Sequence, residues 1–221
     1  MKYSESIRDA QAVMMRQDKR VFVCGLGVPA PGEVFGSTRG LKEEFGDQRV
    51  FDTPASENGT LGVLLGASLQ GMRPIMVNQR VDFFLLALDQ LINHASKWKY
   101  MFGGRQEMSV LIRLIVGRGW GQGPQHSQSM HALFAHIPGL TVIMPASSGA
   151  IIDSYAHAVH HHRGPVISLE HRLMYDLTFE RDHEPQVLGR TPFSQRRVRA
   201  GTDITIVSAS IMSLEARRAA E

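Results

Sequence analysis

The stretch MSVLIRLIVGRGWGQGPQHSQ, residues 108–128, joins an apolar segment directly to a polar, glycine-rich one. By composition, residues 108–117 are predicted to form a strand that is buried on both faces. The segment after it places three glycines and a proline around Trp120 and then presents Gln-His-Ser-Gln. Glycine at this density indicates backbone that lies close to a ligand or turns through φ values that other residues avoid. We therefore expect a central strand that leads into a candidate site.

Apolar strands alternate with helices along most of the chain. Strands are expected at residues 21–24, 73–79, 108–117, 140–147 and 164–171, with a brief one ending at Asp52. Helices are expected at residues 4–17, 41–45, 57–69, 83–104, 127–136 and 148–162. This alternation, with central strands that are apolar on both faces, predicts an α/β, doubly wound, mostly parallel sheet with helices on both faces.

Unusual polar and glycine residues follow the strands of this predicted sheet. The segments concerned are GLGVPAPG at residues 25–32, DTPASENG at 52–59, NQRVDF at 78–83 and GRGWGQGPQHSQ at 117–128. In open parallel sheets, ligands bind outside the carboxyl ends of the strands. We expect these segments to build one site together.

Composition argues against several classes of protein. The chain has 221 residues, of which 43% are hydrophobic and 20% are charged, as in an ordinary globular protein. No apolar run reaches the roughly 18 to 20 residues of a membrane span, and the first residues lack the apolar core of a secretory signal. The single cysteine, Cys24, is typical of a reducing, cytoplasmic setting. The net charge of +3 comes from scattered basic residues, so neither a nucleic acid nor a membrane is expected as a partner.

The alternating pattern ends in a polar stretch that contains prolines. We expect a first domain at residues 1–178, a linker at 179–201 and the start of a truncated C-terminal domain at 202–221. Residues 202–210 are predicted to form a strand and residues 211–221 a helix. One strand and one helix cannot bury a core of their own.

Four long motifs, in order along the chain, point to a known family. They are DTPASENGTLGVLLGASLQGMRPI at residues 52–75, LDQLINHASKWKYMFGG at 88–104, GWGQGPQHSQSMHALFAHIPGLTVIMPAS at 119–147 and PVISLEHRLMY at 165–175. With them, the chain resembles the beta subunits of the decarboxylating component of 2-oxoacid dehydrogenase complexes, which include pyruvate, branched-chain 2-oxoacid and acetoin dehydrogenases. The resemblance runs nearly end to end, into the start of a transketolase-type C-terminal domain.

This resemblance implies a thiamine-diphosphate pyrimidine-binding domain and an oxidoreductase activity. Members of the family decarboxylate a 2-oxo acid and pass the acyl group to lipoamide. The resemblance also implies an alpha-type subunit in an α2β2 heterotetramer, which supplies the diphosphate and Mg²⁺ site, and, in a full complex, a lipoyl-bearing acyltransferase. No metal ligand is expected from this chain.

Three residues match functional positions of the family. Glu57 matches the glutamate that hydrogen-bonds the pyrimidine ring of thiamine diphosphate and favours the tautomer that accepts a proton from the thiazolium carbon. Phe83 matches the aromatic ring that stacks against the aminopyrimidine. His126 matches the histidine near the substrate, where an imidazole exchanges protons near neutral pH. Glu57 and His126 are thus the expected catalytic residues, and Glu57 and Phe83 are expected to bind the cofactor.

The chain departs from the family pattern at three places. Leu26 stands where the family carries an acid, and leucine neither transfers protons nor binds water. Gln79, Arg80 and Asp82 replace apolar and small residues close to the expected pyrimidine site, which makes Gln79 a candidate cofactor contact. Because burial of an unpaired Arg80 is costly, we expect it to pair with Asp82 or a carboxylate ligand and to help recognise an acidic or more polar 2-oxo acid. The segment HHHRGP, residues 160–165, replaces the family's monovalent-cation turn, so that cation site is not carried over.

Two alternative functions stay open at this point. Leu26 and the polar residues near Arg80 also suit a carboligase or a simple decarboxylase that uses the same cofactor without lipoamide. The short C-terminal segment also suits a non-catalytic assembly subunit, although Glu57 and His126 argue against one.

A run of histidines ends one of the predicted helices. His157 and residues 160–162 have a spacing that resembles metal ligands, but no carboxylate or cysteine accompanies them. Cationic side chains are favoured at the C-terminal end of a helix. We therefore interpret the run as a solvated helix end.

Overall fold

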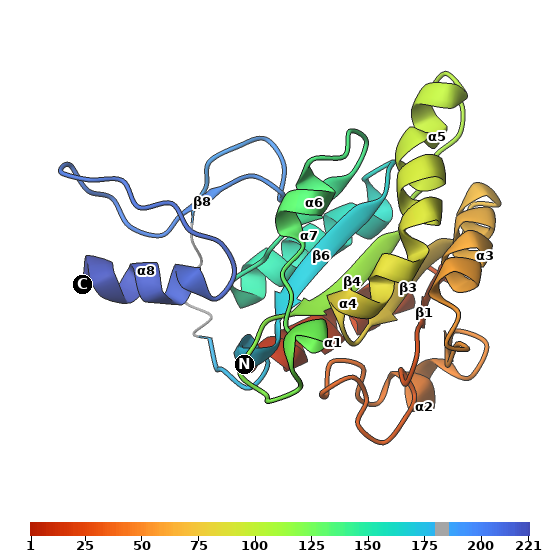
Figure 1. Ribbon diagram of the computed structural model, residues 1–221, viewed down its shortest axis with the longest axis horizontal. Helices are drawn as coiled ribbons and strands as arrows, with labels where there is room; N and C mark the ends of the chain where they lie inside the picture. Colours follow the sequence, from red (N-terminus) through yellow and green to blue (C-terminus); the bar gives the residue numbers. More distant parts are fainter. Residues whose placement is uncertain (180–185) are drawn as a thin grey trace.

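The computed structural model describes residues 1–179 and 186–221. Its main body is a sheet of six strands in the order β2-β1-β3-β4-β6-β5 (Figure 1). The strands are β1 (Val21–Cys24), β2 (Val50–Phe51), β3 (Arg73–Asn78), β4 (Leu111–Val116), β5 (Thr141–Ile143) and β6 (Val166–His171). Every pairing within this sheet is parallel, which confirms the predicted doubly wound α/β fold.

Helices cover both faces of the sheet (Figure 1). One face carries α1 (Tyr3–Gln17) and α7 (Ser148–His160), which also pack against each other. The other face carries α3 (Glu57–Leu69), α4 (Val81–Phe84), α5 (Ser96–Met101) and α6 (His131–Ala135). The short α2 (Leu41–Phe45) precedes the edge strand β2. Within the described ranges, no helix combines the length and the apolar character needed to cross a membrane.

The central strand β4 is buried on both faces, as its composition predicts. Leu111 and Ile115 belong to the core that contains α1 and α7, whereas Ile112, Leu114 and Val116 belong to the core on the other face. Successive side chains of a strand point to opposite faces, so the strand contributes to both cores. Full burial of each aliphatic side chain contributes roughly 1.5–3 kcal/mol. This packing holds the carboxyl end of β4 firmly in place.

One arginine is buried within this apolar strand. Arg113 has no exposed surface, and its Nε and Nη2 atoms each donate to the Glu170 carboxylate of β6 at 2.8 Å. The hydroxyls of Tyr155 and Tyr175 also donate to Glu170, and Arg113 Nη1 donates to the Gln11 side chain at 3.0 Å. Buried charges are tolerated when they are paired and hydrogen-bonded. The network therefore ties β4 and β6 to α1 and α7.

The long helix predicted at residues 83–104 is present without interruption over residues 81–101, but its winding changes along its length. It begins with α4, tightens to a 3-10 turn at Leu85–Ala87, widens to a π-helix at Gln90–Ala95 and continues as α5. The Ser96 hydroxyl donates to the Ile92 carbonyl at 2.8 Å, a contact of the kind that often bends helices. Short π-helical turns are frequent at functional sites, and this one follows the turn that carries Phe83.

Past the sheet, the chain is less regular. β7 (Gln186–Val187) and β8 (Arg196–Arg197) form a short antiparallel hairpin, and α8 (Met212–Ala220) follows (Figure 1). The helix predicted at residues 211–221 is confirmed, but the strand predicted at 202–210 is wrong. A strand needs a neighbour for its backbone hydrogen bonds, and no described strand pairs with this stretch. The predicted linker, 179–201, includes residues 180–185, which lie outside the described residues.

Candidate active site

The loops that follow β1, β3 and β4 meet at one edge of the sheet. After β3, the side-chain amide of Gln79 donates to the Leu26 carbonyl, which lies beyond β1, at 3.2 Å. Arg80 Nη2 donates to the side-chain oxygen of Gln122, which lies beyond β4, at 2.9 Å. The polar segments expected to build one site are therefore in contact at the carboxyl ends of the strands, where parallel sheets bind ligands.

A pocket of about 480 Å³ opens at this edge, and Gln79, Arg80, Phe83, Gln122 and His126 line it. The rings of Phe83 and His126 meet edge to face, with centroids 5.2 Å apart. Because 38% of Phe83 is exposed, an aromatic surface faces solvent beside the pocket. Four residues expected at the site thus lie together, in a pocket of ordinary size for a small-molecule site.

His126 presents an unsatisfied nitrogen in this region. It ends the 3-10 turn Pro124–His126, and its carbonyl accepts a hydrogen bond from Trp120 Nε1 at 3.0 Å. Its Nδ1 atom is buried and has no partner among the described residues. A buried polar atom without a partner costs about 1–3 kcal/mol, which favours a ligand that supplies one.

Three glycines give the loop that carries His126 its shape. Gly119, Gly121 and Gly123 have φ values of 100°, 71° and 77°, which L-residues rarely adopt. A Cβ atom added at any of them would meet no heavy atom of the chain within 4 Å. The glycines are therefore needed for the backbone conformation and not for packing within this chain. It stays a prediction that these glycines also allow a cofactor to approach the loop closely.

Arg80 is a buried cation whose hydrogen-bond partners are neutral. Only 8% of the residue is exposed, its Nη1 donates to the Gln79 carbonyl at 2.7 Å, and its Nε is buried without a partner in the described part of the chain. The expected pairing with Asp82 is wrong: Asp82 lies in the first turn of α4 and accepts from Gln128 Nε2 at 2.7 Å. Burial, and then the positive charge of Arg172, lower the pKa of Arg80.

Arg80 is held in a clamp of aromatic rings that the sequence does not reveal. Its Cζ atom lies 4.6 Å from the ring centroid of Trp120 and 5.4 Å from that of Phe35. The Cζ of Arg172 lies 4.4 Å from the Phe35 ring. Residues 33–35 all have positive φ, between 43° and 57°, and such strained backbone clusters at functional sites. No local pattern marks Phe35, whereas Gln122 could have been noticed because it lies in the glycine-rich loop.

Glu57 is the first residue of α3, which follows β2 at the same edge of the sheet. Its side chain is partly exposed and does not line the pocket. Within the described ranges its carboxylate has no hydrogen bond or ion pair, although the positive end of the helix dipole favours a carboxylate at this position. Its role toward a cofactor stays a prediction.

A different carboxylate lies beside Leu26, where the family acid is replaced. Leu26 is 41% exposed. The backbone N–H of Gly27 donates to Asp52 Oδ1 at 2.8 Å. Asp52 thus brings an acidic group from the loop after β2 to the turn after β1.

The histidines at the end of α7 are partly packed, so the expected solvated helix end is only partly correct. The rings of His157 and His162 pack edge-on against Phe193, with centroids 4.8 and 5.3 Å away. Burial lowers the pKa of both histidines. His161 is exposed. Among the described residues, no group of three or more His, Cys, Asp or Glu side chains is arranged to hold a metal ion.

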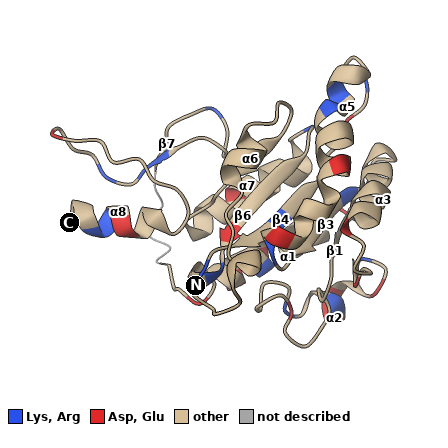
Figure 2. Ribbon diagram, viewed as in Figure 1, with Lys and Arg blue, Asp and Glu red and all other residues tan. Residues whose placement is uncertain are grey.

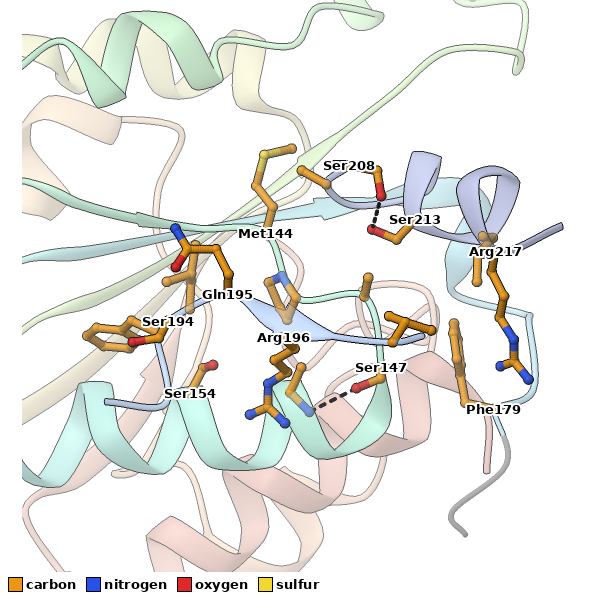
Figure 3. Close-up of a pocket in the computed structure, with 18 of the residues that line it drawn as sticks. Met144, Ser147, Ser154, Phe179, Ser194, Gln195, Arg196, Ser208, Ser213 and Arg217 are labelled. Carbon is orange, nitrogen blue, oxygen red and sulfur yellow. Dashed lines mark hydrogen bonds between the residues drawn. The ribbon is translucent and has the colours of Figure 1, made fainter. Parts of the chain in front are cut away.

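A second cavity, of about 830 Å³, lies between β5, α7 and the C-terminal segment. Figure 3 shows its walls, where Ser147, the N-cap of α7, and Ser154 of α7 lie on one side and Gln195 and Arg196 of the C-terminal segment on the other. None of the predicted site residues lines it. The pocket beside Arg80 is therefore the stronger candidate for an active site.

Charged residues are interspersed over the molecule in Figure 2, and acidic and basic side chains share both α2 and α8.

Comparison with known proteins places this geometry in a family. A family model described as "Transketolase, pyrimidine binding domain" matches residues 1–178. A solved structure titled "Split gene transketolase, inactive beta4 tetramer" superimposes with a TM-score of 0.72 at 20% identity, over 98% of this chain and 65% of that one. At this identity the superposition supports the fold alone.

Several curated relatives are more similar in sequence. The chain is 38% identical to the acetoin:2,6-dichlorophenolindophenol oxidoreductase subunit beta of Cupriavidus necator over 98% of its own length and 63% of the relative. It is 38% identical to the pyruvate dehydrogenase E1 component subunit beta of Rhizobium meliloti, over 100% of this chain and 48% of the relative. It is 37% identical to the 2-oxoisovalerate dehydrogenase subunit beta of Bacillus subtilis, over 100% of this chain and 67% of the relative.

The chain therefore spans between 48% and 67% of the length of these three relatives. The resemblance to 2-oxoacid dehydrogenase beta subunits is confirmed, and the chain belongs to the transketolase pyrimidine-binding-domain family.

Proposed function

We propose that this chain supplies the pyrimidine-binding half of a thiamine-diphosphate-dependent active site that decarboxylates a 2-oxo acid. The observation that carries the proposal is the set of unsatisfied polar groups at the carboxyl edge of the sheet. The buried His126 Nδ1 and Arg80 Nε atoms lack partners in the described part of the chain, and the partly exposed Glu57 begins α3 at the same edge. Perturbed or unsatisfied groups of this kind gather at functional sites.

The residues at this edge fit the cofactor that the family implies. Glu57 offers a carboxylate for a ring nitrogen, Phe83 offers an exposed aromatic surface, and the Gln79 side chain lies beside both Leu26 and the pocket. When bound, thiamine diphosphate supplies the nucleophilic carbon and the electron sink for decarboxylation. The diphosphate and Mg²⁺ site is proposed to lie on an alpha-type partner in an α2β2 assembly.

Each side chain has a separate task in this proposal. Glu57 holds a proton at the pyrimidine ring nitrogen, because a carboxyl group beside that nitrogen stabilises its protonated form. Phe83 packs against the ring and fixes its plane. His126 faces the substrate, where its free Nδ1 exchanges a hydrogen bond or a proton with the substrate oxygen. Lipoamide on an acyltransferase is the proposed acyl acceptor.

The test uses the chain assembled with an alpha-type subunit and measures CO₂ release from 2-oxo acids with and without thiamine diphosphate and Mg²⁺. We expect cofactor-dependent turnover, and we expect Glu57→Gln to lower the rate by about 10²- to 10⁴-fold, the usual range for one acid–base group. Glu43→Gln is the matched control, since Glu43 also lies in the first turn of a helix but on α2. Cofactor-independent turnover, or equal effects of the two variants, would contradict the proposal.

The product analysis separates this function from the alternatives. Acyl-lipoamide in the presence of an acyltransferase supports a dehydrogenase component, whereas acetoin-type products or a free aldehyde support a carboligase or a simple decarboxylase. Absence of turnover by a correctly assembled complex that binds the cofactor supports an assembly subunit.

A further inference from the structure

We propose that Arg80 binds a second carboxylate of the substrate, and hence that the substrate class is 2-oxo dicarboxylic acids. This inference rests on the proposed function for the identity of the reaction. The anion site itself is argued from the geometry around Arg80.

The guanidinium of Arg80 is held in one position. Trp120 and Phe35 lie within 4.6 and 5.4 Å of its Cζ atom, and Nη1 and Nη2 donate to the Gln79 carbonyl and to Gln122 Oε1. A guanidinium that is already stacked and hydrogen-bonded loses little conformational entropy when it binds a ligand. The side chain is therefore preorganised at the wall of the pocket.

Among the described residues, no carboxylate forms an ion pair with Arg80, although the charge of Asp82 acts to raise its pKa. The two hydrogen-bond acceptors of Arg80 are neutral, and the nearest acid in sequence, Asp82, accepts from Gln128 instead. Arg172 adds a second positive charge on the Phe35 ring. Arg172 has an acid of its own, since its Nη1 donates to Asp176 at 3.3 Å. A buried, unpaired charge is unfavourable, so the pocket favours an anion that reaches Arg80.

The reaction itself indicates which carboxylate Arg80 binds. Decarboxylation removes the C1 carboxylate: the C1–C2 bond breaks, CO₂ leaves, and the electron pair stays on C2. A buried cation that held the C1 carboxylate would stabilise the ground state more than the transition state, because that charge disperses as CO₂ forms, and would slow the step. A cation that holds the distal carboxylate binds the ground state and the transition state equally and positions C2. Arg80 therefore suits the carboxylate that survives the reaction.

The first experiment measures binding without the cofactor, so that no reaction occurs. Trp120 stacks on Arg80, so its fluorescence reports an anion at the guanidinium, and a Trp98→Phe background removes the signal of the second of the two tryptophans. We titrate the full chain with 2-oxoglutarate and with 2-oxobutanoate. A charge-assisted hydrogen bond predicts that the dianion binds about 10- to 100-fold more tightly.

Substitutions assign this preference to Arg80. Arg80→Gln is expected to bring the preference of 2-oxoglutarate over 2-oxobutanoate close to 1, whereas Arg80→Lys keeps the charge and is expected to retain part of it. Arg118→Gln is the matched control, because Arg118 is an exposed arginine of the same glycine-rich loop that does not line the pocket, and it should leave the preference unchanged. Urea unfolding of each variant shows whether it is folded. If Arg80→Gln does not fold, the loss of preference in Arg80→Lys relative to Arg118→Gln decides the question.

Three outcomes would overturn the inference. They are equal binding of the two acids by the unsubstituted chain, no saturable binding of 2-oxoglutarate, and a preference that survives in Arg80→Gln. Turnover with thiamine diphosphate tells this failure apart from failure of the proposed function. Cofactor-dependent turnover of 2-oxobutanoate with no preference for the dianion refutes only the role of Arg80. An Arg80-dependent preference in a complex without cofactor-dependent turnover refutes only the proposed function.

Discussion

Among the described residues two arginines are buried, and they differ in what surrounds them. Arg113, in the middle of β4, has no exposed surface and donates to the Glu170 carboxylate, which also accepts from two tyrosines. Arg80, just after β3, is 8% exposed, and its hydrogen-bond acceptors within the described ranges are neutral, with aromatic rings beside them. The first guanidinium is satisfied by the fold, whereas the second leaves a nitrogen without a partner in the described part of the chain.

This difference separates a structural charge from a functional one. Burial of an ion is tolerated when the folded chain itself supplies the opposite charge and the remaining hydrogen bonds. Where the chain supplies no ion pair and leaves a buried guanidinium nitrogen without a partner, as at Arg80 Nε, stability alone does not explain the charge, and a ligand does. Active sites commonly contain such locally unfavourable groups, which the rest of the fold compensates.

The largest expected effect comes from breaking the satisfied pair. Glu170→Gln keeps the shape of the side chain but leaves Arg113 as an uncompensated buried charge, so the free energy of unfolding should fall by about 3–5 kcal/mol. Urea denaturation measures this. The double variant Arg113→Met, Glu170→Leu removes both charges and should recover most of the loss. If the free energy of unfolding of Glu170→Gln fell by less than about 1 kcal/mol, the Arg113–Glu170 pair would be exposed to solvent and not buried.

Alkaline pH tests the same network through its tyrosines. Burial, and then the charge of Glu170, raise the pKa of Tyr155 and Tyr175 well above the ordinary value. Because the unfolded chain loses these protons first, their contribution is complete below about pH 10 and is lost as pH rises toward the folded-state pKa. Above about pH 10, each tyrosine lowers the free energy of unfolding by about 1.4 kcal/mol per pH unit. Tyr155→Phe should reduce the slope by one such increment, and an unchanged slope would contradict the burial of this hydroxyl.

A smaller loss of stability is expected from a substitution in the glycine-rich loop that contacts Arg80 and carries His126. At Gly119, φ is 100° and no atom would clash with an added Cβ, so Gly119→Ala should cost only the conformational strain, about 1 kcal/mol. At Gly25 an added Cβ would lie 2.1 Å from the Val77 carbonyl oxygen, and Gly25→Ala should cost clearly more. Thermal unfolding of the two variants side by side checks the order. Equal losses would mean that Gly25 does not lie against β3.

The smallest effect is expected at the unsatisfied arginine. Arg80→Met replaces a charge that forms no described ion pair by an apolar side chain that still packs on Trp120 and Phe35, so the free energy of unfolding should change by less than about 1 kcal/mol. Urea denaturation beside Glu170→Gln makes the comparison direct. A loss of about 3 kcal/mol or more would mean that Arg80 is a structural charge like Arg113.

The sheet and most of its helices could be predicted because their signals are local. The alternation of apolar strands with helices is visible along the chain, and α3 begins and ends where the pattern predicts, at Glu57–Leu69. The prediction that depends on a distant neighbour was wrong, since the stretch at 202–210 finds no neighbouring strand in the described part of the chain. The helix predicted at 83–104 is present over residues 81–101, and only its winding could not be predicted.

The site could be predicted in part, for the same reason. Gln79, Arg80, Phe83 and His126 could be singled out from motifs, and the fold brings all four to one pocket. The hydrogen-bond partners of Arg80 could not be predicted from the sequence. Asp82 is close to Arg80 along the chain, but side chains that the folded sheet brings near Arg80 bind it instead. Gln122 and Phe35 reach Arg80 from 42 and 45 positions away along the chain, and the register between strands decides such contacts. The Arg113–Glu170 pair, 57 residues apart, depends on the parallel pairing of β4 with β6 in the same way.

The central claim is tested most directly by a crystal structure of this chain with an alpha-type subunit, thiamine diphosphate and Mg²⁺. We expect a Glu57 carboxylate oxygen to lie within hydrogen-bond distance of a pyrimidine ring nitrogen and Phe83 to pack against the same ring. A bound cofactor whose pyrimidine contacts neither residue, with Glu57 directed into solvent, would contradict it.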